Sequence, residues 1–402
     1  SSQFRHLRLT ELSVLLVYPN MCQPTAINPP AALSWGVLHC KEAWWEPADW
    51  RLAMFVALVS SVCWGSWSNT AKDASARVNF AHFYMDFCIG TVLTAVIFEF
   101  TLGAGVFGRA YVDMSLCAYA AAGGALWGLS NLLLTIGVAL AGLAIAIPLS
   151  VGTGLVGGTV LTYWVDRRGS PELIFAGVLL ALFGVIANSH AYATLEASRR
   201  RGGGCCDSMD TEMVGRCPDA APAAVCDSRT VVVPSAPSTA KSTGLCIMAG
   251  VLMTLWAPLA AKSKDGVQGL SPYFSLVCFT AAAFAVDVPI LVAQQYGCLL
   301  IPSIDRPTSA REYLRLPPLL HGWGLLGGFI WAVGTVSNLI SSRTLGSAVS
   351  YALGQTSPVV AAVWGLVRYR EFKGAPREPV LALVAMFVSF SAAIALLSLG
   401  GS

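Results

Sequence analysis

The stretch that decides the fold is residues 346–365, GSAVSYALGQTSPVVAAVWG, an apolar run that carries Ser350, Tyr351 and Gln355. About 20 residues of helix cross a hydrocarbon core of about 30 Å. At about 100° per residue, Ser347, Tyr351 and Gln355 fall on one face, and the opposite face is valine and leucine. A polar face in lipid is costly unless it meets protein or water, so this pattern indicates a helix within a bundle.

The composition places the whole chain in a membrane. Of 402 residues, 55% are hydrophobic and 12% are charged, whereas about a quarter of a soluble domain is charged. We therefore expect an all-α membrane protein with ten transmembrane helices, and Gly142 and Pro148 favour a hairpin rather than one long segment between the third and fourth. The expected helices are 52–71, 81–102, 116–140, 143–165, 172–194, 243–261, 272–294, 320–341, 345–367 and 378–399.

Two segments do not have the composition of lipid-embedded helices. Residues 1–50 mix Pro, Trp and charges and lack a signal-peptide pattern, so we expect a poorly structured extension. The first residue is Ser rather than Met, which suggests a fragment or an imperfect gene model. Residues 196–242 are rich in Gly, Pro, Ser and charge, as flexible linkers are. The linker separates two five-helix units, 51–195 and 243–402.

The two units share a weak internal similarity. Three pairs stand at an offset of 192: Trp64 and Trp256, Lys72 and Lys264, Asp73 and Asp265. GGALW at 123–127 pairs with GGFIW at 327–331 at an offset of 204. Because each unit has an odd number of helices, the second unit must be inverted relative to the first, as in many secondary transporters. Duplication without transport is the alternative.

Polar and aromatic residues form stripes on several of the expected helices. Single Ser or Gly residues in such stripes are more often contacts between helices. Trp, Tyr, Asn and Gln need more room, and aromatic planes beside amides suit a polar small molecule. We therefore expect a solute cavity. Its expected substrate-binding residues are Trp64, Trp67, Trp127, Asn131, Trp331, Asn338, Tyr351 and Gln355.

Acidic residues inside the apolar runs are candidates for proton coupling. Asp287 stands near the middle of its run, whereas Asp86 and Glu99 stand near the ends of theirs. An ionisable group within a membrane span is a functional candidate by default. Asp86 and Asp287 are the expected proton carriers, if transport is coupled to protons at all. Lys72 and Lys264 are interpreted as topology anchors, with gate charges as the alternative.

Enzymatic and nucleic-acid functions find little support. The five histidines show no metal-ligand spacing, and neither a nucleophile elbow nor a phosphate-binding glycine loop occurs. Cys205, Cys206, Cys217 and Cys226 lack a C-x-x-C pair, so we expect reduced thiols and no metal site. The net charge of +3 does not suggest nucleic-acid binding. We expect no enzyme activity, no cofactor and no metal.

Seven segments carry a resemblance to a known family. They are CWGSWSNTAK (63–72), HFYMDFCIG (82–90), AGGALWGLSNLLL (122–134), GLAIAIPLSVGTGLVGG (142–158), GGFIWAVG (327–334), SYALGQTSPVVAAVWG (350–365) and EFKG (371–374). In these the chain resembles the drug/metabolite transporter superfamily, specifically its glucose/ribose porter and ureide permease branches. The resemblance covers roughly residues 52 to 400.

The resemblance implies a ten-helix bundle with a central cavity that imports or exchanges a sugar or a ureide such as allantoin. Similar plant ureide permeases carry a membrane-embedded Glu where this chain has Ile147. That departure favours a sugar or polyol as the solute. The alternatives are a ureide, allantoin or nucleobase permease, or a transport-inactive sensor or scaffold.

Lys and Arg counts predict the orientation in the membrane. Loops on the linker side hold the larger share, including Arg199 to Arg201, so we expect the linker in the cytosol and both termini outside it. Which membrane, plasma membrane or endomembrane, stays open, as does a homodimer. The expected partners are a small polar solute and the lipid bilayer.

Overall fold

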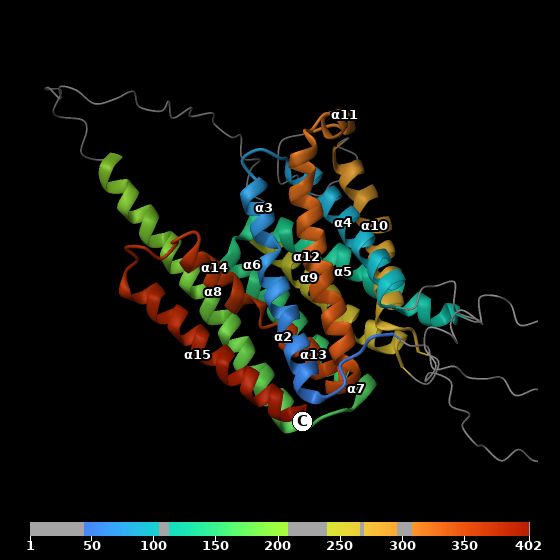
Figure 1. Ribbon diagram of the computed structural model, residues 1–402. Helices are drawn as coiled ribbons and strands as arrows, with labels where there is room; N and C mark the ends of the chain where they lie inside the picture. Colours follow the sequence, from blue (N-terminus) through green and yellow to red (C-terminus); the bar gives the residue numbers. More distant parts are fainter. Residues whose placement is uncertain (1–43, 104–111, 208–238, 266–268, 296–307, 402) are drawn as a thin grey trace, which may run out of the picture.

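The computed structural model describes residues 44–103, 112–207, 239–265, 269–295 and 308–401, and within these ranges the regular structure is entirely helical (Figure 1). In chain order the helices are α2 (Trp50–Ser66), α3 (Ser68–Ala74), α4 (Phe80–Thr101), α5 (Met114–Ala141), α6 (Leu143–Ile147), the π-helix η2 (Pro148–Gly152), α7 (Thr153–Asp166), α8 (Pro171–Asp207), α9 (Thr239–Ser263), α10 (Pro272–Gln295), α11 (Ala310–Leu314), α12 (Pro318–Leu345), α13 (Ser347–Gly354), α14 (Ser357–Val367) and α15 (Arg377–Gly400).

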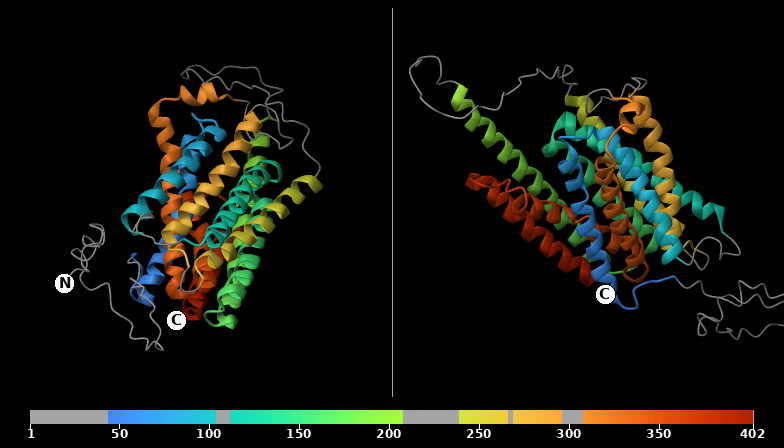
Figure 2. Two further views of the ribbon diagram at one scale, coloured as in Figure 1. Left: turned by 90° about the vertical axis from the view of Figure 1, so that its right-hand side faces the viewer. Right: turned by 45° about the horizontal axis from the view of Figure 1, so that its top comes forward.

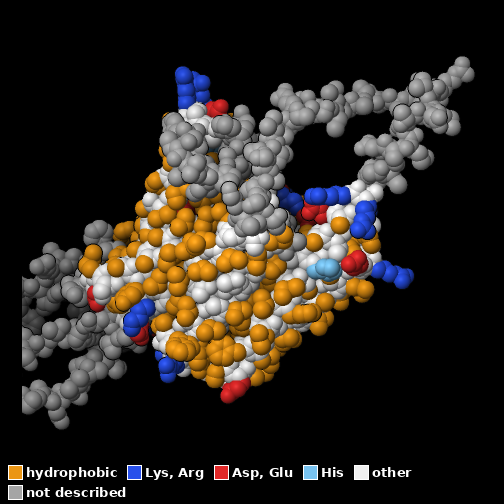
Figure 3. Space-filling model, turned by 180° about the vertical axis from the view of Figure 1, so that it is seen from behind, with side chains coloured by type: hydrophobic (Ala, Val, Ile, Leu, Met, Phe, Trp, Pro, Cys, Tyr) orange, Lys and Arg blue, Asp and Glu red, His pale blue; other side chains and the backbone are white. Residues whose placement is uncertain are grey.

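Nine helical stretches in the described ranges are long and apolar enough to cross a membrane. They correspond to nine of the ten expected helices. The surface agrees with a lipid environment, because hydrophobic side chains cover much of the face seen in Figure 3 and charges gather towards its margins. Phe55, Leu179 and Phe183 are each more than half exposed, and apolar side chains can face lipid without loss of hydrogen bonds.

The ninth expected helix, 345–367, is not one continuous helix. It consists of α13 and α14, which Gln355 and Thr356 separate. Pro358 lies in the first turn of α14 and has no N–H to donate to the carbonyl of Gly354, so the helical hydrogen-bond ladder stops there. The fourth expected helix is also irregular, with a π-turn that begins at Pro148. Apolar length alone predicted neither break.

Two glycines make matching sharp connections between helices. Gly142 joins α5 to α6 with φ 77°, and Gly346 joins α12 to α13 with φ 89°. A residue with a side chain is strained at such positive φ values, whereas glycine adopts them freely. The Gly142 turn agrees with the expected break between the third and fourth helices. The two glycines stand at the same offset, 204, as the GGALW and GGFIW segments.

The helices define two ends of the bundle. We call the end where α8 finishes and α9 starts the linker-side end, and the end where α2 starts and α15 finishes the terminus-side end (Figures 1 and 2). α12 and α15 both run from the linker-side end to the terminus-side end. α8 and α15 pack together at the edge of the bundle, antiparallel, and the Ser170 N–H donates to the carbonyl of Gly400.

The central helices approach closely through a second pair of glycines. A Cβ added to Gly124 of α5 would lie 1.9 Å from the carbonyl oxygen of Phe279 on α10. A Cβ added to Gly328 of α12 would lie 2.3 Å from that of Phe87 on α4. Glycine is therefore required at both crossings, which bring α5 against α10 and α12 against α4.

The expected linker of 196–242 is partly helical at both ends, because α8 continues to Asp207 and α9 starts at Thr239. The rest of the linker, 208–238, lies outside the described residues, as do Cys217 and Cys226. Residues 1–43 of the expected N-terminal extension also lie outside them.

Candidate functional site

An aromatic cluster occupies the centre of the bundle and joins both halves of the chain. The rings of Trp127 on α5 and Trp331 on α12 lie with their centroids 4.1 Å apart. Phe279 packs against both rings, at 5.9 and 6.1 Å. Trp256 lies 5.7 Å from Phe279, and Trp64 lies 6.0 Å from Trp256. The cluster offers planar, apolar surfaces on which a flat solute can stack.

A buried carboxylate lies next to this cluster. Asp287 of α10 has no exposed surface, and its Oδ2 accepts a long hydrogen bond of 3.4 Å from the Tyr84 hydroxyl. Asn131 of α5 donates to the same hydroxyl at 2.7 Å. Asp287 Oδ1 has no hydrogen-bond partner among the described residues. The chain therefore keeps an acceptor unsatisfied inside the bundle, which is costly unless a ligand, proton or cation meets it.

Asn338 of α12 is held between helices. Its amide nitrogen donates to the carbonyl of Ser350 at 2.6 Å and to the Ser60 hydroxyl at 3.4 Å. Tyr351 is equally engaged, because its hydroxyl donates to the carbonyl of Gly154 at 2.9 Å. These contacts fit the interhelical alternative that the sequence left open for its polar stripes.

A small pocket lies between α9, α12 and α13, towards the terminus-side end. It is lined by Trp256, Ala257, Ala260, Ala261, Lys264, Asn338, Leu339, Ser342, Ser347 and Tyr351. Lys264, just after α9, is buried, and its Nζ donates to the Ser342 hydroxyl at 2.5 Å and to the carbonyl of Leu339 at 3.2 Å. The Trp256 Nε1–H has no partner among the described residues. The pocket thus joins the aromatic cluster to a buried amine.

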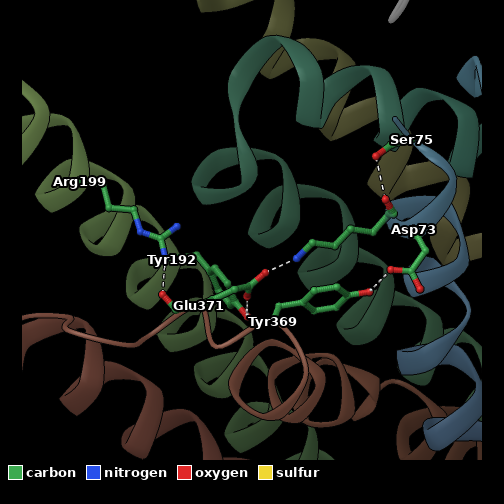
Figure 4. A network of polar contacts seen from close by, with 7 residues as sticks. Asp73, Ser75, Tyr192, Arg199, Tyr369 and Glu371 are labelled. Atoms are coloured by element: carbon green, nitrogen blue, oxygen red, sulfur yellow. Dashed lines mark hydrogen bonds and ion pairs between the residues drawn. The ribbon is translucent and has the colours of Figure 1, made fainter. Parts of the chain in front are cut away.

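Charged contacts join the two halves of the chain at the linker-side end (Figure 4). Lys72 forms an ion pair with Glu371, and its Nζ also lies 3.6 Å from the ring centroid of Tyr369. Arg368 donates to Asp73 at 2.8 Å. Glu371 further accepts from the hydroxyl of Tyr192 and, through its backbone carbonyl, from Arg199 of α8. α3, α8 and the segment after α14 therefore meet at one residue, Glu371.

A second polar cluster lies at the same end. Asp86 of α4 accepts from the Tyr313 hydroxyl at 2.5 Å and contacts His321 Nδ1 of α12 at 2.8 Å. The neighbouring His82 lies 5.5 Å from the Tyr313 ring and contacts the Thr308 hydroxyl at 2.9 Å. Asp86 thus ties α11 to the ends of α4 and α12.

The terminus-side end is held by a different set. The carboxylate of Asp166 accepts from the Ser347 backbone N–H at 2.5 Å. Arg168 donates to the carbonyl of Arg343 at 2.8 Å, and Arg343 pairs with Glu46 at 3.1 Å. These contacts also join the first half of the chain to the second.

The structure brings most of the predicted substrate-binding residues into the aromatic cluster or against it, and it places the others elsewhere in the bundle. Trp64, Trp127 and Trp331 belong to the aromatic cluster, and Trp67 extends it through Phe87 at 4.8 Å. Tyr351 reaches it through Trp256 at 5.3 Å. The other predicted residues lie apart: Asn131 is beside Asp287, Asn338 is in the interhelical contact, and Gln355 is half-buried at the break between α13 and α14.

Several residues of these clusters were not predicted as site residues. Trp256 and Phe279 could have been found from the repeat, because Trp256 pairs with Trp64 and Phe279 stands 192 positions after Phe87. Tyr84 stands in the quoted HFYMDFCIG segment without an assigned role. His321 and Tyr313 carried no pattern that pointed to Asp86. Among the described residues, no three His, Cys, Asp or Glu side chains form a cluster that could hold a metal ion.

Comparison with known proteins adds a family likeness. A model of the ureide permease family matches residues 226–399. Ureide permease 5 of Arabidopsis thaliana is 23% identical over 391 residues, which covers 86% of this chain and 93% of that protein. Ureide permease 1 of the same plant is 24% identical over 348 residues, which covers 79% and 88%. A solved crystal structure aligns with 85% of this chain at 14% identity and a TM-score of 0.48, too distant to add to the assignment.

These matches correct one expectation and agree with others. They favour the alternative of a ureide permease over the sugar or polyol porter, and they do not support the glucose/ribose porters or the wider drug/metabolite transporter superfamily. With nine apolar spans in the described residues, they support an integral, multi-pass membrane protein. The chain is similar over most of its length to ureide permeases, which are transporters and not enzymes.

Proposed function

We propose that this chain is a ureide permease, a secondary transporter that carries a small polar solute with urea-type N–H and carbonyl groups by alternating access. The observation that carries the proposal is the aromatic cluster beside the unsatisfied carboxylate oxygen of Asp287. A planar urea-type group stacks on aromatic rings and donates N–H hydrogen bonds to a carboxylate. The similarity to ureide permeases points the same way.

The architecture in this proposal is two inverted five-helix repeats, 51–195 and 243–402, with α13 and α14 together as the ninth crossing and α15 as the tenth. The direction of the helices supports it, since α12 and α15 run the same way and the chain between them must return. Matching features at fixed offsets also support it. These are Gly142 with Gly346, Gly124 with Gly328, Trp127 with Trp331, and Phe87 with Phe279.

Alternating access needs a closure at each end that opens in turn. At the linker-side end, the proposed closure is the pair Lys72–Glu371 with Asp73–Arg368. At the terminus-side end, it is the contact of Asp166 and Arg168 with the segment around Arg343 and Ser347. Each closure joins one repeat to the other, so relative movement of the repeats breaks one and preserves the other.

The proposed solute contacts follow from the geometry. Trp127, Trp331 and Trp64 supply stacking surfaces, and Asp287 supplies the acceptor. Gln355 remains a proposed hydrogen-bonding group because its half-buried side chain lies at a break between helices. Asn338 and Tyr351 position these groups through their backbone contacts.

For coupling to protons, we put Asp287 ahead of Asp86. Asp287 is fully buried and has an unpartnered oxygen, so its ionised form is poorly compensated in this conformation. Asp86 already has His321 and Tyr313 as partners at the linker-side end. A group that is compensated in one conformation and not in the other can load and release a proton as the conformation changes.

The test is uptake by purified protein in proteoliposomes, with radiolabelled allantoin, uracil, glucose and a polyol as separate substrates. We expect allantoin uptake that saturates and that unlabelled hydantoin inhibits. A preference for uracil or for glucose would assign a different solute class. Absence of uptake for the whole panel, in protein shown to be folded by its thermal unfolding, would favour the sensor or scaffold alternative instead.

A further inference from the structure

The proposed repeat makes a direct comparison possible between Trp64 and Trp256. The two indoles pack against each other across the centre of the bundle. The Trp64 Nε1–H donates to the Thr335 hydroxyl at 3.1 Å. The residue 204 positions before Thr335 is Asn131, and its amide donates to Tyr84 instead. The Trp256 Nε1–H is left without a partner among the described residues, although the side chain is 3% exposed.

Lys72 and Lys264, which stand at the same offset as the two tryptophans, also differ in their partners. Lys72 pairs with Glu371, which directly follows Arg370, a residue with a left-handed φ of 50°. In the first half, the matching left-handed residue is Arg167 with φ 49°, and it is followed by Arg168. A basic residue therefore stands where the acidic partner stands in the other half. Lys264 forms no ion pair with a carboxylate within the described ranges and donates only to Ser342 and Leu339.

The two unmatched donors line one pocket. Trp256 lies on α9, and Lys264 directly follows the end of that helix. Both line the small pocket that Tyr351 and Asn338 also border. An ammonium has three N–H donors, and hydrogen bonds to protein groups use two of those of Lys264. A buried N–H without a partner costs about 1–3 kcal/mol. Trp64 and Lys72 have a hydroxyl and a carboxylate as partners, whereas Trp256 has no hydrogen-bond partner and Lys264 no carboxylate partner among the described residues, and these two line the same pocket.

We propose that this pocket is a subsite that binds a carbonyl or carboxylate oxygen of the transported solute through the Lys264 ammonium and the Trp256 indole N–H. The inference rests on the proposed function, because it names how a ureide is oriented. The acceptor oxygen of the solute meets this subsite, towards the terminus-side end. The subsite favours carboxylate-bearing ureides over neutral ones, since a charge-assisted hydrogen bond is the stronger.

The experiment measures binding separately from transport. The purified full chain in detergent is titrated with N-carbamoylglycine, an open-chain ureide with a carboxylate, and with hydantoin, its neutral ring form, and binding is read as the rise in thermal unfolding temperature. We expect both to stabilise the wild type. Lys264→Met weakens the binding of N-carbamoylglycine about 10- to 100-fold, as expected for loss of a hydrogen bond to a charged group, and weakens hydantoin binding less.

Two further variants make the test independent of one substitution. Trp256→Phe keeps an aromatic six-membered ring but removes the pyrrole ring with its N–H, so we expect affinity for both probes to fall about fivefold. Lys262→Met is the matched control: this lysine is exposed, pairs with Asp265 and stands two residues before Lys264. The control should bind both probes as the wild type does.

The outcomes separate this inference from the proposed function. Wild-type affinity in both Lys264→Met and Trp256→Phe, or no stabilisation of the wild type by either probe, overturns the subsite. If allantoin uptake is present but these variants bind normally, only the subsite is wrong. If binding depends on Lys264 and Trp256 but no ureide is transported, the subsite stands and the proposed transport activity falls.

Discussion

Trp127 and Trp331 lie with their ring centroids 4.1 Å apart at the centre of the bundle, and they occupy matching positions in the two halves of the chain. Each is also packed against a phenylalanine from the opposite half: Trp127 against Phe279, and Trp331 against Phe87. In the proposed repeat, the contact is thus made by equivalent residues on equivalent helices. If these rings stack on the solute, removing either should have a similar effect.

The first prediction concerns this pair. Trp127→Ala and Trp331→Ala should each raise the KM for allantoin by about tenfold, because an aromatic stacking contact and its buried area are lost together. Trp164→Ala is the control, since Trp164 is 68% exposed on the outside of α7. An unchanged KM in both cluster variants would remove the rings from the solute site.

The second prediction separates a positioning residue from a solute contact. Asn338→Leu should lower the thermal unfolding temperature, because the carbonyl of Ser350 loses its buried donor. Gln355→Leu should leave the unfolding temperature within about a degree of the wild type and weaken transport instead. Gln355 is half-buried and lies between two helices rather than within one.

The measurements are thermal unfolding in detergent and uptake in proteoliposomes for both variants. A stable Asn338→Leu protein with weakened uptake would return Asn338 to the solute site, as the polar stripe first suggested. A Gln355→Leu protein with normal uptake would remove Gln355 from it.

Sequence patterns located nine crossings because each is an unbroken apolar run that local composition reveals. They did not predict the break within 345–367, since apolar length gives no weight to Gly354 followed four residues later by Pro358. The partners of Asp287 could not be predicted, because Tyr84 stands about 200 positions earlier and no periodicity links the two helices. Lys72 and Lys264 look alike in sequence, and only folding shows that one is paired and the other buried.

The third prediction tests the proton carrier. Asp287→Asn should abolish uptake of allantoin against its gradient and spare exchange of labelled for unlabelled solute, because exchange does not require release of the proton. Asp86→Asn should reduce accumulation less, since Asp86 is compensated by His321 and Tyr313. The measurement is uptake with and without an imposed pH gradient. Wild-type uptake that ignores the gradient would end the coupling hypothesis for both carboxylates.

The fourth prediction concerns the linker-side closure. Lys72→Glu places two carboxylates together with Glu371 and should slow transport several-fold by favouring the state that is open at this end. Glu371→Lys should act in the same direction, and the double exchange should recover part of the wild-type rate. Lys373→Glu in the same loop is the control, because Lys373 is exposed. Failure of the double exchange to improve on either single variant would argue against a direct pair.

The last prediction is the pH dependence of the proposed subsite. Burial lowers the pKa of the Lys264 amine, and the nearby Arg343 guanidinium lowers it further to about 7, against the opposing effect of Asp166. These two charges come from α12 and the end of α7, while Trp256 and Tyr351 line the rest of the pocket. Below pH 7 the free amine is therefore mostly charged, and above it mostly neutral.

An anionic ureide binds best to the charged amine, so above pH 7 its binding must take up a proton. The dissociation constant of N-carbamoylglycine should then rise by up to about tenfold for each pH unit above 7 and level off below pH 7. Hydantoin, which is uncharged near neutral pH, should show a shallower dependence, and the dependence should vanish for both probes in Lys264→Met. The same pH slope in wild type and Lys264→Met would assign the titration to another group and leave Lys264 without a part in solute binding.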